Sequence, residues 1–170
     1  MPNHLSILGI IHTAISIIAA ITAVVALLWT GRIDPKSGTG KLYITLTVIA
    51  CLTALPIMKT GHPGPGHALA VLILVLLLIA VYAHSLRLFG NKAGYVQTIA
   101  MSATLFLSMI PAVKETLTRL PVSHPLADNP NGPLVKTGIL VLLILFAAGI
   151  IYQVVKLKAL RKTYNNTKRD

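Results

Sequence analysis

Five long stretches of apolar residues alternate with short polar connections along this chain. The stretches occupy residues 5–29, 42–58, 68–86, 95–113 and 134–155. Each is close to the 17 to 25 helical residues, roughly, that cross a hydrocarbon core. Runs such as residues 71–78 lack the alternation of apolar and polar positions that a membrane barrel needs, so helices are predicted. The pattern predicts an all-α, polytopic integral membrane protein with five transmembrane helices.

We expect one membrane domain, residues 1–155, followed by a basic tail, residues 156–170. Only 11% of residues are charged and 55% are apolar, whereas a soluble domain has about a quarter of its residues charged. The basic residues lie in short pieces between apolar runs, which argues against a nucleic-acid-binding surface. The first apolar stretch is too long for the core of a cleaved signal peptide. The single cysteine, Cys51, excludes an intrachain disulfide and a four-cysteine zinc site.

The distribution of lysine and arginine predicts an orientation in the membrane. If the five helices alternate in direction, one side receives Arg32, Lys36, Lys41, Arg87, Lys92, Lys156, Lys158, Arg161, Lys162, Lys168 and Arg169. The other side receives Lys59, Lys114, Arg119 and Lys136. Because cytoplasmic segments carry the excess of positive charge, the N-terminus is predicted outside and the tail in the cytoplasm of a cell (inner) membrane. The tail would form a cationic helix extension against anionic lipid headgroups.

Small and weakly polar residues at helical spacing predict which faces pack together, because leucine gains little by leaving lipid. These faces are His12, Ser16, Ala19, Ala23 and Ala26 in the first stretch; Thr47, Ala50, Cys51 and Ala54 in the second; and Gln97, Met101, Thr104, Ser108 and Glu115 in the fourth. The third stretch is expected to face mainly lipid. In the fifth, Gly138 and Gly149 are predicted points of close approach.

The membrane stretches contain no charged residue in their middle parts, which disfavours a proton pump or an ion-coupled carrier. Ser6, Ser16, Ser102 and Ser108 lie in membrane helices, where a hydroxyl most often bonds to its own helix. The turn at residues 61–66 has prolines where a phosphate loop needs backbone N–H groups. The sequence therefore indicates no catalytic residues.

Histidine is the one chemical signal in the chain. Five of the six histidines are predicted on or near the outer side, and only His84 near the cytoplasmic side. Imidazole is a common ligand of transition metals and haem iron. His12 is the strongest candidate ligand because it stands on the small-residue face of its helix. The alternative is a structural hydrogen bond from His12 to a hydroxyl or a backbone carbonyl.

Further candidate ligands lie in the two outer connections. His62 and His67 flank a Gly-Pro turn, and the long proline-rich loop of residues 117–133 carries His124 and Asp128. With Glu115 just upstream, these residues and His12 would form a mixed nitrogen and oxygen site for a divalent transition metal. A single b-type haem bound through His12 and His67 is a second possibility. It is disfavoured because His12 lies about 10 Å inside its helix while the other imidazoles lie at the boundary.

The segment from Ile11 to Leu55 resembles a domain-of-unknown-function family of uncharacterised bacterial multi-span integral-membrane proteins. The resemblance rests on an early histidine (His12), a run of small and aliphatic residues, and a short basic turn that ends in Gly40-Lys41-Leu42-Tyr43. That turn often carries a second histidine in the family, where this chain has Asp34-Pro35-Lys36. The resemblance implies a membrane-embedded helical fold and no particular activity.

Three functions stay open at this point. The first is an inner-membrane protein that binds a metal or redox cofactor through periplasmic histidines and passes electrons or handles a metal. The second is a non-catalytic accessory subunit or assembly factor of a larger membrane complex, in which the histidines are structural. The third is a small transporter of a neutral or apolar substrate.

Overall fold

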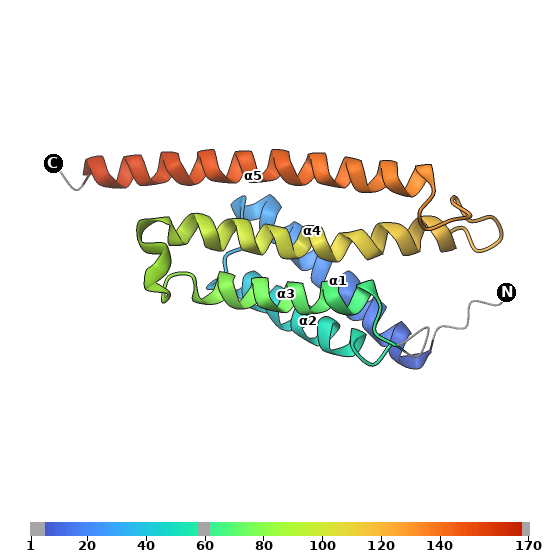
Figure 1. The fold of residues 1–170 in the computed structure, drawn as a ribbon. Helices are drawn as coiled ribbons and strands as arrows, with labels where there is room; N and C mark the ends of the chain where they lie inside the picture. The colour runs from blue at the N-terminus through green and yellow to red at the C-terminus, as the bar shows by residue number, and fades with distance from the viewer. Residues whose placement is uncertain (1–5, 58–61, 168–170) are drawn as a thin grey trace.

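The computed structural model describes residues 6–57 and 62–167, and all regular secondary structure within these ranges is helical (Figure 1). The elements are α1 (Ile7–Thr30), α2 (Gly38–Ala54), α3 (Pro65–Tyr82), the 3-10 helix η1 (Arg87–Lys92), α4 (Ala93–Arg119) and α5 (Pro133–Thr167). By length and composition, α1, α3, α4 and α5 can each cross a membrane, whereas α2 is a shorter apolar helix of 17 residues. The prediction of an all-α membrane protein is confirmed at this level.

The helix ends follow from local capping chemistry rather than from the apolar runs. The hydroxyl of Ser37 accepts the N–H of Gly40 at 3.0 Å, so α2 begins four residues before its apolar run. Pro56 lacks an N–H group, and α2 ends at Ala54. Residue 58, the predicted end of this stretch, lies outside the described residues. At the other end of the chain, α5 continues to Thr167, and most of the basic tail is therefore helical.

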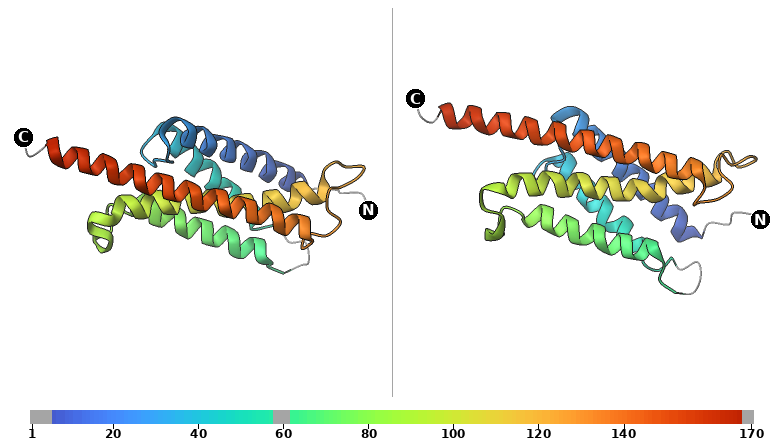
Figure 2. Two further views of the ribbon diagram at one scale, coloured as in Figure 1. Left: turned by 90° about the horizontal axis from the view of Figure 1, so that it is seen from above. Right: turned by 45° about the horizontal axis from the view of Figure 1, so that its top comes forward.

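The fourth helix lies at the centre of the bundle. It packs against α3 on one side and α5 on the other, and α1 crosses behind it with α2 paired to α1 (Figures 1 and 2). Helix α5 lies at the edge, beside α4 (Figure 2). Helices α3, α4 and α5 thus lie side by side, with α1 and α2 behind them (Figure 2).

Small residues line the contacts between these helices, as the sequence predicts. Ala19, Ala23 and Ala26 are buried in α1, Thr47, Ala50 and Cys51 in α2, and Gln97, Met101 and Thr104 in α4. Glu115 departs from the prediction: its side chain is 49% exposed and pairs with Arg119 one turn further on. The inward stripe of α4 thus ends before its last turns.

Three polar contacts connect α4 to its neighbours inside the bundle. The Tyr43 hydroxyl of α2 donates to Thr104 Oγ1 at 2.9 Å, because the Thr104 proton goes to the Met101 carbonyl. Gln97 Nε2 donates to the Ala80 carbonyl of α3 at 3.0 Å. Both hydrogen bonds lie inside the bundle, where lipid has no group that competes for them.

The third contact joins α4 to α5. The hydroxyl of Ser102 donates to Gln153 Oε1 at 2.8 Å, and both side chains are buried. The rings of Phe106 and Phe146 stack near this pair with centroids 4.7 Å apart. Together these contacts fix the rotation of α5 about its own axis.

Helix α3 is less peripheral than the sequence suggests. Ala70, Ile73, Leu77 and Ala80 are buried on one face, while Val71, Leu72, Val75 and Leu78 are exposed on the other. An apolar helix in lipid shows little contrast between its two faces. For this reason hydropathy alone did not identify the buried face.

The two glycines of α5 behave differently. A Cβ atom on Gly138 would lie 3.0 Å from Val113 Cγ1 and 3.3 Å from Leu117 Cδ1, so the predicted close approach is confirmed there. A Cβ atom on Gly149 would meet no described atom within 4 Å, and the prediction for Gly149 is wrong. Gly138 therefore allows α5 to approach α4 closely near the N-terminal end of α5.

We expect Gly138→Leu to lower the stability of the bundle by about 1–3 kcal/mol, because the new side chain must push α5 away from Val113 and Leu117. Gly149→Leu is the matched control, since both changes raise helix propensity equally and only the first meets a neighbour. Thermal unfolding in detergent compares the two variants. Equal melting temperatures would contradict the packing of α5 described above.

Candidate functional site

The bundle has two chemically different ends. The Lys156 ammonium donates to the Thr30 carbonyl at 3.1 Å, and Arg161 Nη1 donates to the Asn91 carbonyl at 2.6 Å. These contacts bring the turn after α1, the η1 segment and the extension of α5 together, and we call this the basic end. The opposite end, which we call the histidine end, contains the start of α1, the α2–α3 connection and the loop of residues 120–132 (Figure 1).

The histidines divide between these ends as the sequence predicts. His12, His62, His67 and His124 lie at the histidine end, and His84 lies at the basic end beside Gly94. His4 and Lys59 lie outside the described residues. The separation is a property of the fold, whichever side of a membrane each end faces.

His12 connects α1 to the end of α2. Its Nδ1 lies 2.9 Å from the Ala50 carbonyl and 3.3 Å from Thr53 Oγ1. A carbonyl only accepts hydrogen bonds, so Nδ1 carries the proton and donates. The partner is thus the backbone of the neighbouring helix, which is the structural alternative that the sequence left open for His12.

His67 connects α3 to the same region. Its Nδ1 accepts the N–H of Gly64 at 3.0 Å, and its Nε2 donates to the Leu55 carbonyl at 2.9 Å. The first bond fixes the tautomer, because a nitrogen that accepts an N–H carries no proton. Both ring nitrogens of His67 are therefore occupied by backbone groups, and metal binding would break one of these bonds.

The two imidazoles brace the C-terminal end of α2 from both sides. The last carbonyl groups of a helix lack partners within that helix and carry partial negative charge. His67 donates to such an open carbonyl, that of Leu55, whereas His12 donates to the Ala50 carbonyl in the last turns of α2, which also accepts the Thr53 hydroxyl. His67 also satisfies the first N–H of the α3 turn, so one side chain caps two helices. This pair is the clearest polar site at the histidine end.

The other predicted ligands are not brought together. Glu115 pairs with Arg119 on α4, while His124 and Asp128 are exposed in the loop of residues 120–132. The N–H of Ala127 donates to the Leu117 carbonyl at 2.8 Å, which folds this loop back onto the end of α4. Within residues 6–57 and 62–167, no three His, Cys, Asp or Glu side chains form a group that could hold a metal ion.

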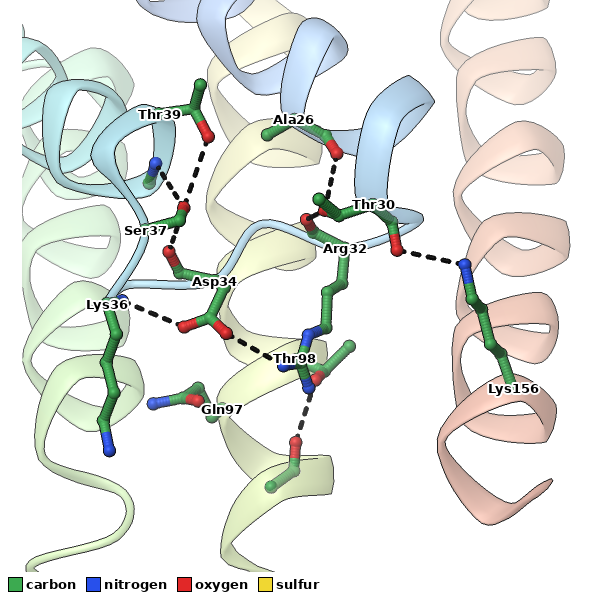
Figure 3. A network of polar contacts seen from close by, with 12 residues as sticks. Ala26, Thr30, Arg32, Asp34, Lys36, Ser37, Thr39, Gln97, Thr98 and Lys156 are labelled. Atoms are coloured by element: carbon green, nitrogen blue, oxygen red, sulfur yellow. Dashed lines mark hydrogen bonds and ion pairs between the residues drawn. The ribbon is translucent and has the colours of Figure 1, made fainter. Parts of the chain in front are cut away.

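Sequence reasoning missed the polar network at the basic end (Figure 3). Asp34 binds Arg32 Nη2 at 2.8 Å and accepts the N–H of Lys36 at 2.9 Å, and its carbonyl accepts the Ser37 hydroxyl. The hydroxyl of Thr30 contacts the Ala26 and Arg32 carbonyls. The sequence signal for this network is Asp34 directly before Pro35, which is typical of a turn closed by the aspartate side chain, followed by the N-cap residue Ser37. The network holds the α1–α2 turn in one conformation.

A shallow apolar groove lies along α3 beside His67. Its lining residues are Pro63, Gly64, His67, Ala68, Val71, Leu72 and Val75. The groove is open rather than enclosed, and its walls offer hydrocarbon contacts.

Comparisons with known protein families, with curated proteins and with solved structures find no match for this chain. The resemblance of residues 11–55 to uncharacterised bacterial membrane proteins stays a prediction.

We expect His67→Ala to lower the stability of the bundle by about 1–2 kcal/mol, because it removes the cap of α3 and the bond to Leu55. His67→Gln is the matched variant, since a glutamine at this helix position can still accept the N–H of Gly64. Its loss should be smaller. Thermal unfolding and protease cleavage in the α2–α3 connection measure both effects, and an unaffected His67→Ala protein would refute the bracing role.

Proposed function

We propose that this chain is a multi-pass membrane protein that crosses the bilayer five times and serves as a non-catalytic accessory subunit or assembly factor. One observation supports the non-catalytic role. The imidazole N–H groups of His12 and His67 are committed to backbone carbonyls at the end of α2. These two histidines therefore connect α1 and α3 to α2.

The packing of α2 supports five crossings rather than four. Helix α2 has 17 residues, which correspond to about 26 Å at 1.5 Å per residue, slightly less than a hydrocarbon core of about 30 Å. Its end reaches the start of α1 through His12 and the start of α3 through His67. Helix α2 begins beside the end of α1 and finishes beside His12, the sixth residue of α1, so it covers most of the length of that helix.

The charge difference between the ends supports an orientation. The basic end holds the turn, the η1 segment and the tail, which carry most of the lysine and arginine. Under the positive-inside rule this end faces the cytoplasm, and the histidine end faces the periplasm of an inner membrane. The N-terminus is then outside.

The exposed apolar surface supports a role in assembly. Helix α5 buries little of its surface inside the bundle, and Val135 and Gln153 are buried where it meets α4. Leu140, Val141, Leu143, Ile144, Leu145, Ile151 and Val155 are exposed along the rest of the helix. This surface is available to lipid and to the apolar helices of a larger complex. A small transporter of a neutral or apolar substrate is the less supported alternative, since the pocket beside His67 is an open groove.

Cofactor binding is the second candidate, and one feature of His12 favours it. Metal-binding histidines commonly donate one ring N–H to a carbonyl and use the other nitrogen as the ligand. His12 donates through Nδ1 to the Ala50 carbonyl, which leaves Nε2 for a divalent transition metal or a single b-type haem. Further ligands would have to come from outside the described residues or from a partner chain.

The topology is tested by labelling single cysteines from each side of the membrane. After Cys51→Ser, a cysteine at Lys36 should react only from the cytoplasmic side and a cysteine at Asn131 only from the outside. Labelling of both positions from one side would contradict a map with an odd number of crossings. Exchanged sides would refute the orientation alone.

The two candidate functions are separated by the composition of protein purified from its own membranes. The accessory role predicts a colourless protein without stoichiometric metal that co-purifies with membrane partners. Stoichiometric copper, zinc or iron, or a haem absorption band, would support the cofactor role, and His12→Ala should then abolish it while the protein stays folded. His12→Ala should otherwise cost about 1 kcal/mol of stability through the lost bond to Ala50.

A further inference from the structure

The basic end has a positive surface on which some basic side chains bond to other parts of the protein and others do not. Its described basic residues are Arg32, Lys36, Lys41, Arg87, Lys92, Lys156, Lys158, Arg161 and Lys162. Asp34 is the acidic residue among the described part of this end, and it pairs with Arg32. The surface is therefore strongly positive over three separate chain segments.

Two of these basic residues, Lys156 and Arg161, bond the extension of α5 to other segments of the protein. Lys156 donates to the Thr30 carbonyl and lies 5.7 Å from the centre of the Tyr152 ring. Arg161 donates to the Asn91 carbonyl and lies 4.6 Å from the centre of the Tyr95 ring. These contacts hold the extension of α5 against the bundle, so its other lysines keep fixed positions relative to the α1–α2 turn.

The ammonium groups of five lysines at this end have no hydrogen bond or ion pair to atoms that the structure describes. They belong to Lys36, Lys41, Lys92, Lys158 and Lys162, and all five side chains are exposed. Figure 3 shows the Lys36 side chain extending away from Asp34, which contacts only its backbone. These ammonium groups are available to an anionic partner.

Aromatic and apolar side chains beside these lysines indicate that the partner is a lipid surface. Leu28 and Trp29 are 79% and 77% exposed at the end of α1, and Leu88 in η1 is 87% exposed next to Arg87. Tyr82 and Tyr152 are also exposed at this end. Tryptophan and tyrosine concentrate at the membrane interface, with lysine and arginine just beyond it. A soluble anionic ligand would not explain the large exposed apolar side chains.

We propose that the basic end is a binding surface for anionic phospholipid headgroups, formed jointly by the α1–α2 turn and the extension of α5. This proposal rests on the membrane insertion proposed above and adds a preference among lipids. Lys156 and Arg161 position the extension, and Lys36, Lys41, Lys158 and Lys162 bind the lipid phosphates. Trp29 lies in the same interface and reports on the lipid beside it.

Quenching of Trp29 by brominated lipids tests the proposal directly, because Trp29 is the single tryptophan in the chain. The full-length protein is reconstituted in phosphatidylcholine bilayers that contain either brominated phosphatidylglycerol or brominated phosphatidylcholine. Stronger quenching by the anionic lipid gives its relative association constant at the basic end. Each lysine near a charged membrane surface contributes up to about a fivefold preference.

The decisive variant is Lys36→Gln with Lys41→Gln, which should lower the preference for the anionic lipid by up to about fivefold for each lysine removed. The control is Lys114→Gln with Lys136→Gln, which removes the same charge at the histidine end and should leave the preference unchanged. Equal quenching of the unmodified protein by both lipids would overturn the lipid preference and leave the membrane insertion intact. So would an equal effect of the two double variants.

A further outcome would bear on the membrane insertion as well as on the lipid preference. If neither brominated lipid quenches Trp29, the basic end does not lie at a bilayer, and both the insertion and the lipid preference are wrong. Circular dichroism of each variant confirms that the helices are retained, so a changed quenching ratio reflects the charges.

Discussion

Backbone groups that a helix leaves open must find a partner within the protein when lipid surrounds it, and this constraint explains the histidine end. Helix α2 is the shortest of the long helices and ends just before Pro56. His67 from α3 donates to the open carbonyl of Leu55, directly after the last residue of α2. The position where α2 stops therefore explains His67. His12 instead links α1 to the Ala50 carbonyl, which lies within α2 and also accepts the Thr53 hydroxyl.

The central position of α4 depends on the same principle. Three of its buried polar side chains meet a group on a neighbouring helix: Gln97 meets α3, Ser102 meets α5 and Thr104 meets α2. Small residues at the contacts allow the helices to approach closely enough for these short side chains to reach. The polar contacts thus specify which face of each apolar helix turns inward, a choice that leucine and isoleucine leave open in lipid.

Much of the fold could be predicted from the sequence, and less of the site. The apolar runs identify the helices, and the alanines of α1 identify a face that is buried in the structure. The division of the histidines between two ends follows from counting the helices. The buried face of α3 could not be predicted because its residues are uniformly apolar. The partners of His12 and His67 could not be predicted because both are backbone carbonyls, which every sequence carries at every position. The ion pair between Glu115 and Arg119 could be predicted, because the two residues are four positions apart on one helix.

Helix α5 packs on α4, and Lys156 and Arg161 add single hydrogen bonds to the Thr30 and Asn91 carbonyls. The other four long helices also contact one another without α5, through the pairs α1–α2, α2–α3, α3–α4 and α1–α4. The packing surface for the last helix is therefore one side of α4, where the Ser102 hydroxyl bonds to Gln153. Biogenesis can accordingly proceed in two stages, with a preformed core that recruits its final segment laterally from the bilayer.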